Sequence, residues 1–255
     1  MTTHRKGVHS NPPSFLGWSA TERAVEVRSL EFMGANTESQ DLAVVITGAT
    51  QIIFRHSAGH PDDTPCNHSE DEHTILYLGT RVSNAAQAFW CLLLYGYYGP
   101  ALTVQRDVVE STLLLQRFAL RPSDVAIWRQ SDVNERLKAF SPSKNRRILD
   151  ASSEPHLYWR FRAYSELAAH PTPRGRGLTT MDGRYWTGPH FNEKLLAELV
   201  RHCALHVLFA CDVLCGFDFL GNPDEGPRAK LRELLDNSLG IDGSVDGDVN
   251  SPGEK

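Results

Sequence analysis

The stretch NEKLLAELVRHCALHVLFACDVLCG, from Asn192 to Gly216, decides the fold class of this chain. Its apolar residues recur at helical spacing and, beyond Cys203, cover most faces of the expected helix. A helix that is apolar on nearly all sides is stable only when other elements surround it. We therefore expect this helix to lie at the centre of a protein built from packed helices.

Helical spacing dominates the rest of the chain as well. It predicts further helices over about residues 19–33, 39–59, 70–98, 100–120, 123–130, 132–140, 143–150, 155–170 and 226–239. The one convincing strand signal is Asp182-Gly183 between two β-prone runs, which is typical of a type I′ turn. The predicted fold is thus all-α, a multi-helix bundle with one small β-hairpin insertion near residues 178–187.

The chain of 255 residues is long enough for one substantial core, which we place in a single helical domain over residues 18–239. Within that domain the helices of residues 121–153 are more polar than the others and predict a peripheral arm. Residues 1–17 and the Gly, Ser and Asp rich tail of residues 240–255 have few apolar groups to bury, so we expect both ends to be disordered.

Composition excludes several classes of protein. A net charge of -5 gives no overall attraction to nucleic acid or anionic lipid. Five cysteines are an odd number, and the N-terminus lacks the apolar stretch of a signal peptide, so we expect a cytoplasmic protein without a disulfide framework. The uncharged window from Ala85 to Val104 contains Gly99-Pro100, which would break a membrane helix, and it predicts core rather than a membrane span.

Sequence motifs of common enzymes are absent. The chain contains no GxGxxG after a strand, no GxxxxGK[ST], no GxSxG and no HExxH. The absence of these motifs argues against several classes of enzyme: nucleotide hydrolases, Rossmann oxidoreductases, α/β-hydrolases and the commonest zinc proteases.

Two pairs of ionisable residues lie one helical turn apart, Arg106 with Glu110 and Glu166 with His170. If their helices face each other across a groove, the four side chains would form a cluster able to bind an anion or move a proton. The predicted ligand-binding set also includes two neighbours of Glu166, Arg162 and Ser165. The alternative is a set of surface ion pairs, each worth about 0.3 to 0.5 kcal/mol.

The same segments carry a resemblance. The run RDVVEST and the later run RAYSELAAHP, followed by a long closing helix, resemble uncharacterised bacterial helical-bundle families with an R-x-x-x-E helix and a helix that ends in His-Pro. The resemblance covers about residues 85–215. It implies an all-helical fold and brings no established activity.

The segment from Arg201 to His206, RHCALH, resembles the R-x4-6-H motif of HEPN-type ribonucleases, including the polar His202 directly after the arginine. That resemblance implies an all-α domain that dimerises and cleaves RNA without metal, with catalytic residues Arg201, His202 and His206. Histidine suits general acid or base chemistry, and arginine stabilises charge on phosphate. The stretches 55–60 and 184–190 fit the same loose pattern, and the apolar neighbours of His206 favour its burial.

Two histidine-rich patterns raise the question of metal. Glu198, His202 and His206 share one helix face, but such a site needs a further ligand from another helix. The stretch from His56 to His73 has one cysteine and irregular spacing, which favours a solvated acidic loop over a zinc site. We therefore predict no metal and no cofactor, and keep a metal-binding bundle as an alternative.

The predicted hairpin offers a partner surface. Arg184, Tyr185 and Trp186 there would suit RNA, through stacking and phosphate contacts, or a protein partner. The alternative is that Trp186 and Phe191 pack beneath the hairpin. The sequence leads to an interaction or sensing protein of bacterial type, a homo-oligomer through an exposed helix face and without a membrane partner. A HEPN-like, metal-independent endoribonuclease is the alternative, and whether the chain is an enzyme is left open.

Overall fold

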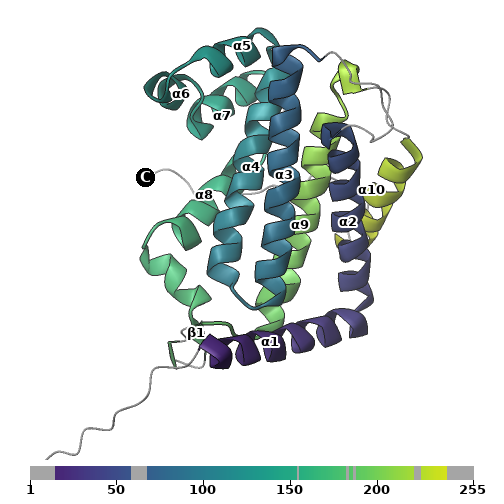
Figure 1. Ribbon diagram of the computed structural model, residues 1–255, viewed down its shortest axis with the longest axis vertical. Helices are drawn as coiled ribbons and strands as arrows, with labels where there is room; N and C mark the ends of the chain where they lie inside the picture. Colours follow the sequence, from purple (N-terminus) through teal and green to yellow (C-terminus); the bar gives the residue numbers. More distant parts are fainter. Residues whose placement is uncertain are drawn as a thin grey trace, which may run out of the picture.

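The computed structural model describes residues 15–58, 68–153, 155–181, 184–185, 188–220 and 225–239. This part of the chain contains ten α-helices, so the predicted all-α bundle is confirmed (Figure 1). The helices are α1 (Phe15–Ala35), α2 (Thr37–Ala58), α3 (Glu70–Leu94), α4 (Tyr98–Leu120), α5 (Ser123–Gln130), α6 (Val133–Ala139), α7 (Pro142–Ala151), α8 (Tyr158–Tyr164), α9 (Glu193–Leu214) and α10 (Glu225–Leu239).

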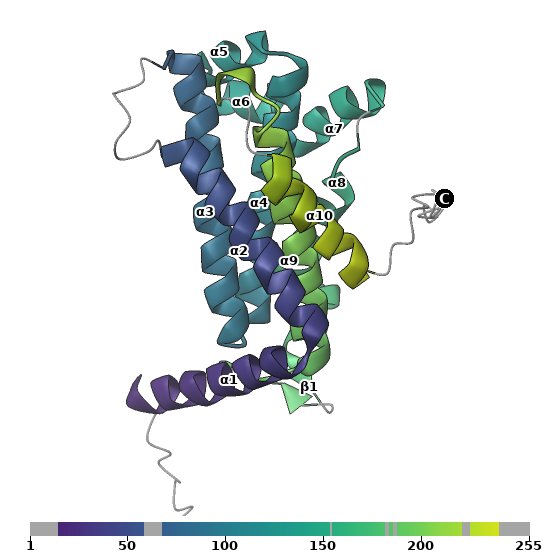
Figure 2. The same ribbon diagram turned by 90° about the vertical axis from the view of Figure 1, so that its right-hand side faces the viewer.

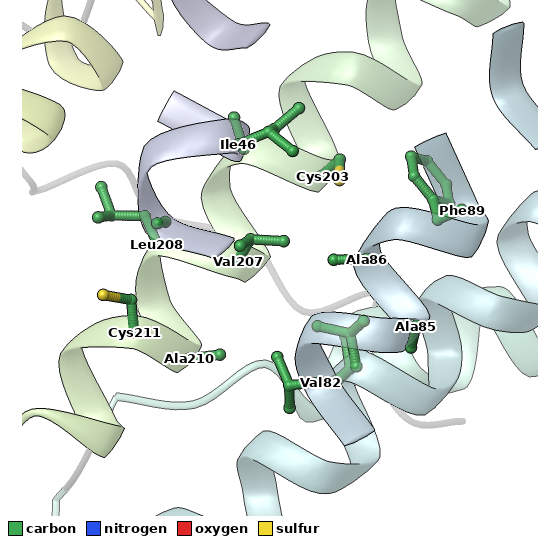
Figure 3. Close-up of a cluster of buried hydrophobic side chains, with 14 of the residues drawn as sticks. Ile46, Val82, Ala85, Ala86, Phe89, Cys203, Val207, Leu208, Ala210 and Cys211 are labelled. Atoms are coloured by element: carbon green, nitrogen blue, oxygen red, sulfur yellow. The ribbon is translucent and has the colours of Figure 1, made fainter. Parts of the chain in front are cut away.

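Four long helices, α2, α3, α4 and α9, run side by side and form the body of the bundle (Figure 1). The helix α9 contacts the other three, as its apolar sequence predicts. Figure 3 shows Val207 and Ala210 of α9 facing Val82 and Ala86 of α3. Figure 2 shows α10 lying across α2 and α9, and α1 crossing one end of the bundle.

Local signals explain where several helices begin and end. Ser69 and Glu72 form a capping box at the start of α3, and Asn192 caps α9. The first helix, expected to begin near residue 19, begins earlier, and Ser19 lies inside α1. Between α3 and α4 the chain turns at Gly96, whose φ is 77° and where a Cβ would lie 2.2 Å from the carbonyl oxygen of His190. Only glycine fits this turn.

Residues 155–170 form a shorter α-helix than the sequence predicts. After α8 the chain widens into one π-helical turn, η1 (Ser165–Ala169), and then continues into the 3-10 helix η2 (Pro173–Leu178). Pro171 cannot continue a helix, which accounts for the break after His170. Another 3-10 turn, η3 (Asp218–Leu220), follows α9.

The predicted hairpin over residues 178–187 is not supported. Pairing is limited to β1 (Thr180–Met181) and β2 (Arg184–Tyr185), two residues on each side. Leu178 belongs to η2 and packs into the core, so it cannot extend the first strand. Asp182, Gly183 and Trp186 lie outside the described residues.

Two further findings bear on the sequence predictions. In the described ranges, none of the helices is both long and apolar enough to cross a membrane. The four cysteines whose positions the structure describes, Cys91, Cys203, Cys211 and Cys215, are free thiols. The predicted leader, residues 1–17, and the tail, residues 240–255, lie largely outside the described residues.

Candidate functional site

A hollow lies where α3 and α4 meet the three short helices α5, α6 and α7, which we call the arm. This pocket has a volume of about 230 Å³. Its walls are largely apolar, and they come from both the bundle and the arm. The apolar lining includes Leu78, Leu114, Trp128, Leu137 and Phe140, and the ionisable lining consists of Arg81, Asp107, Glu110 and Arg136.

The arm is attached to the bundle through Arg117 of α4, which is only 6% exposed. Its guanidinium donates hydrogen bonds to Asp124 (2.6 Å), to the carbonyl oxygen of Ala139 (2.5 Å) and to Asn145 (3.1 Å). The same guanidinium lies 4.0 Å from the ring centre of Phe140. One buried arginine therefore holds all three arm helices, and with them the outer wall of the pocket. We call these five residues the arginine hub.

An ion pair forms part of the pocket wall on the bundle side. Arg81 of α3 donates two hydrogen bonds to Asp107 of α4, the longer of them 3.0 Å. Both residues also line a second hollow of about 550 Å³, which continues along the groove between α3 and α4 past Asn84 and Val104. Because Arg81 and Asp107 neutralise each other, neither presents an unpaired charge to a ligand.

Glu110 is the acid of the pocket that is least engaged. Its carboxylate lies 3.6 Å from Arg106, beyond hydrogen-bond distance, and its side chain is 43% exposed. Partial burial raises the pKa of Glu110 above its ordinary value, and Arg106 opposes that shift. A carboxylate that has lost part of its hydration and has only this long ion pair favours a cationic or hydrogen-bonding ligand.

The predicted ligand-binding cluster is not assembled as one group. Arg106 turns toward α8 and lies 4.6 Å from the ring centre of Phe161. Glu166 pairs instead with Arg162, at 4.0 Å, and with Arg174. Among the described residues, no recorded ion pair or hydrogen bond joins Arg106 or Glu110 to Glu166 or His170.

The other members of that predicted set have local roles. The hydroxyl of Ser165 donates a hydrogen bond of 2.8 Å to the carbonyl oxygen of Phe161. His170 is exposed at the end of η1, where its amide donates to the carbonyl oxygen of Ser165. Of the six predicted residues, only Glu110 lines the pocket beneath the arm.

The predicted catalytic residues Arg201 and His206 point to different neighbours. Arg201 faces α2 and forms a two-pronged ion pair with Glu38, in which its Nη2 donates at 2.8 Å. His206 is 0% exposed, and its Nδ1 lies 2.6 Å from the side-chain nitrogen of Gln105 on α4. Five residues turn a helix through about 140° beyond one full turn, so the two side chains leave α9 on different sides. Among the described residues, Arg201 and His206 therefore have different partners and do not meet.

His202 belongs with His206 in a second buried polar group, which we call the histidine cluster. It consists of Gln105, Tyr164, His202 and His206, and the rings of Tyr164 and His206 lie 5.6 Å apart. Burial lowers the pKa of His202 to about 4, with a further contribution from Arg160, which lies 3.2 Å from the ring nitrogen of His202. Each member of the cluster has one buried polar atom without a hydrogen-bond partner among the described residues.

The described side chains do not form either of the metal sites considered from the sequence. Within the described ranges, no group of three or more His, Cys, Asp or Glu side chains is arranged to hold a metal ion. Glu198 lies on the same helix as His202 and His206, but among the described residues no side chain from another helix provides a further metal ligand. In the stretch from His56 to His73, His60 and Cys66 lie outside the described residues.

Comparison with known proteins adds no relative. No family model, curated protein or solved structure matches this chain. The HEPN-like resemblance and the likeness to bacterial helical-bundle families therefore have no support from these comparisons.

Most residues of the pocket are not evident from the sequence. Arg81 and Asp107 are on different helices, and their contact depends on how α3 packs against α4. Trp128, Arg136 and Leu137 are on the arm, which the sequence marks as peripheral but does not place. The available signal was Arg117, a charged residue in the apolar run from Leu113 to Phe118, because a charge among core residues needs buried partners.

Proposed function

We propose that this chain is a binding or sensing protein, and that its ligand occupies the pocket between α3, α4 and the arm. The observation that carries the proposal is the position of Glu110 at a largely apolar pocket whose outer wall is a separately anchored arm. Apolar walls with a few polar groups at defined positions are typical of small-molecule sites.

The lining favours a small, mostly apolar ligand that carries a cationic group. Trp128, Phe140 and Leu137 supply aromatic and aliphatic contact surface. Arg81 is paired with Asp107, and the guanidinium of Arg136 donates to the carbonyl oxygen of Ser131, which leaves Glu110 as the carboxylate available to a cation. A cation opposite Glu110 would relieve the cost of its partial desolvation, and this interaction would distinguish an amine from a neutral compound of the same shape.

A pair of matched probes tests this proposal. Phenethylamine and 2-phenylethanol have the same ring and chain length and differ mainly in charge, and their binding to the full chain is measured by calorimetry. We expect the amine to bind more tightly than the alcohol, and Glu110→Gln to remove that difference. Glu233→Gln on the exposed face of α10 is the matched control and should bind as the wild type does. Equal heats for both compounds, or an amine preference that survives Glu110→Gln, would contradict the proposal.

The homo-oligomer stays a prediction. The arm exposes three apolar side chains, Ile127 (53%), Val133 (64%) and Leu137 (66%), and a second copy of the chain would bury such a surface. Mass determination in solution checks this, with Val133→Asp as the variant that should give a monomer. A monomeric wild type would contradict the prediction. The cytoplasmic location is likewise an expectation from the sequence alone.

A further inference from the structure

A basic segment runs along one flank of an otherwise acidic protein. Residues 141–190 contain eight Lys or Arg and four Asp or Glu, a net charge of +4, whereas the remaining residues carry -9 of the total of -5. In space this segment forms α7, α8, η1, η2 and the strand pair, which follow one another along one side of the bundle (Figure 1). The overall charge therefore conceals a local positive surface.

The centre of this surface is Trp159 of α8, which is 52% exposed. Two guanidinium groups flank its ring, Arg146 of α7 at 4.8 Å and Arg162 of α8 at 5.5 Å from the ring centre. Burying a large aromatic side chain is favourable, so an indole left half-exposed between two arginines offers a surface that suits a binding partner.

A second arginine and aromatic pair lies further along the same flank. Tyr185 of β2 is 68% exposed, and Arg176 of η2 lies 5.5 Å from its ring centre. This pair repeats the combination of exposed ring and stacked guanidinium that surrounds Trp159.

Ion pairs with Glu166 connect the two pairs. Arg162, which stacks on Trp159, lies 4.0 Å from Glu166. Glu166 in turn binds Arg174, which belongs to the same short helix as Arg176. We call the series Arg146, Trp159, Arg162, Arg174, Arg176 and Tyr185 the arginine–aromatic track.

We propose that the arginine–aromatic track binds single-stranded nucleic acid. The guanidinium groups of Arg146, Arg162 and Arg174 pair with Asp150 or Glu166 at the exposed surface, where such pairs are weak and a phosphate can replace the carboxylate. Exposed rings provide faces on which unpaired bases stack. A duplex hides its base faces, so it could use only the charges of the track. An acidic peptide is the competing partner, but carboxylates would leave Trp159 and Tyr185 without a stacking partner. This surface is separate from the pocket beneath the arm, and the inference does not depend on the proposed ligand.

Fluorescence anisotropy with labelled oligouridylate of about 15 nucleotides tests the proposal, a length within the range that single modules of this kind cover. The titration uses the full chain at about 50 and 200 mM salt, since phosphate contacts make affinity depend on salt. We expect saturable binding that weakens with salt and that a duplex of equal length competes for poorly. Trp159→Ala and Tyr185→Ala should each weaken binding by about tenfold, because each removes a stacking face.

The arginines have a separate signature. Arg162→Ala should lower the slope of log affinity against log salt by about one, because it removes one phosphate contact. Arg23→Ala is the matched control, since Arg23 is an exposed arginine on α1 that also pairs with a nearby glutamate. Melting temperatures equal to that of the wild type confirm that each variant is folded.

The outcomes that overturn the proposal are equally definite. No saturable binding at the lower salt concentration would do so, as would an affinity within about twofold of the wild type for either aromatic variant. Displacement by polyglutamate as readily as by unlabelled oligouridylate would assign the surface to an acidic protein partner instead.

Discussion

The arginine hub and the histidine cluster are both buried polar groups to which α4 contributes one residue, Arg117 and Gln105 respectively, yet they differ in how completely their polar atoms are paired. Arg117 has three hydrogen bonds and a ring contact, and its partners come from all three arm helices. In the histidine cluster, one contact of 2.6 Å joins Gln105 to His206, and polar atoms on each member have no partner among the described residues.

Whether a buried polar group is fully paired determines how it affects the fold. A buried charge is tolerated when its partners surround it, and those partners then become fixed relative to one another. A buried neutral group with unmet hydrogen-bonding capacity is held by the packing around it. Protonation gives this group a charge, and burial of that charge destabilises the folded state. We therefore expect the hub to determine whether the arm is attached, and the cluster to determine how stability responds to pH.

The largest expected effect is that of Arg117→Ala. Removing the guanidinium leaves Asp124 buried without its partner, which should lower the free energy of unfolding by about 3 to 5 kcal/mol. Urea unfolding measures the loss, and limited proteolysis shows whether cleavage begins in the arm. Arg121→Ala, an exposed arginine one turn later, is the control and should change stability by less than about 0.5 kcal/mol. Equal losses for the two variants would remove the distinction between the hub and ordinary surface charge.

The second effect concerns pH. Burial lowers the pKa of His202 from 6.5 to about 4 and lowers that of His206 as well, so the unfolded chain binds more protons than the folded one. Stability should therefore fall as the pH falls from about 6.5 toward 4, by about 1.4 kcal/mol for each unit of pKa difference.

A double variant isolates this contribution from the carboxylates that titrate in the same range. In Gln105→Leu with His206→Leu both partners become apolar, which is nearly neutral for stability at pH 7. The loss of stability on acidification should then be smaller than in the wild type, as measured by thermal unfolding across the pH range. Parallel profiles for the wild type and the double variant would mean that His206 does not contribute to acid sensitivity.

The smallest effect is expected at Glu110. Its pKa is raised by burial, so the folded chain binds more protons than the unfolded one, and the carboxylate weakens the fold as the pH rises through the raised pKa. Glu110→Gln should therefore raise the free energy of unfolding at pH 7 by less than about 1 kcal/mol, as substitutions in binding sites often do. At a pH below the ordinary glutamate pKa the gain should disappear. A loss of stability at pH 7 would indicate that Glu110 supports the fold through Arg106.

Sequence patterns predicted the helices far better than the sites. The spacing of Leu196, Val200 and Val207 predicts that α9 is central, and the structure confirms this. Helical periodicity also places α5, α6 and α7 to within about two residues, in the range expected for such boundaries. These features depend on residues close together in the sequence, so the sequence predicts them.

The partners of a side chain depend on the angles between helices, so the local sequence does not predict them. Glu166 was expected near Glu110 but binds Arg174, because the chain turns back after Pro171. The motif from Arg201 to His206 specifies only the number of residues between the arginine and the histidine. On α9 this spacing places the two side chains on different sides of the helix. The partners of Arg117 are 7 to 28 residues away in sequence and meet only through the fold of the arm.

The central claim is that the pocket between α3, α4 and the arm receives a ligand. Hydrogen exchange of the full chain, measured with and without saturating phenethylamine, tests it most directly. We expect slower exchange in peptides from α3, α4 and the arm, with α1 and α10 unchanged. Glu110→Gln should abolish this protection. Protection that is absent from the arm, or that appears equally in α10, would contradict the account.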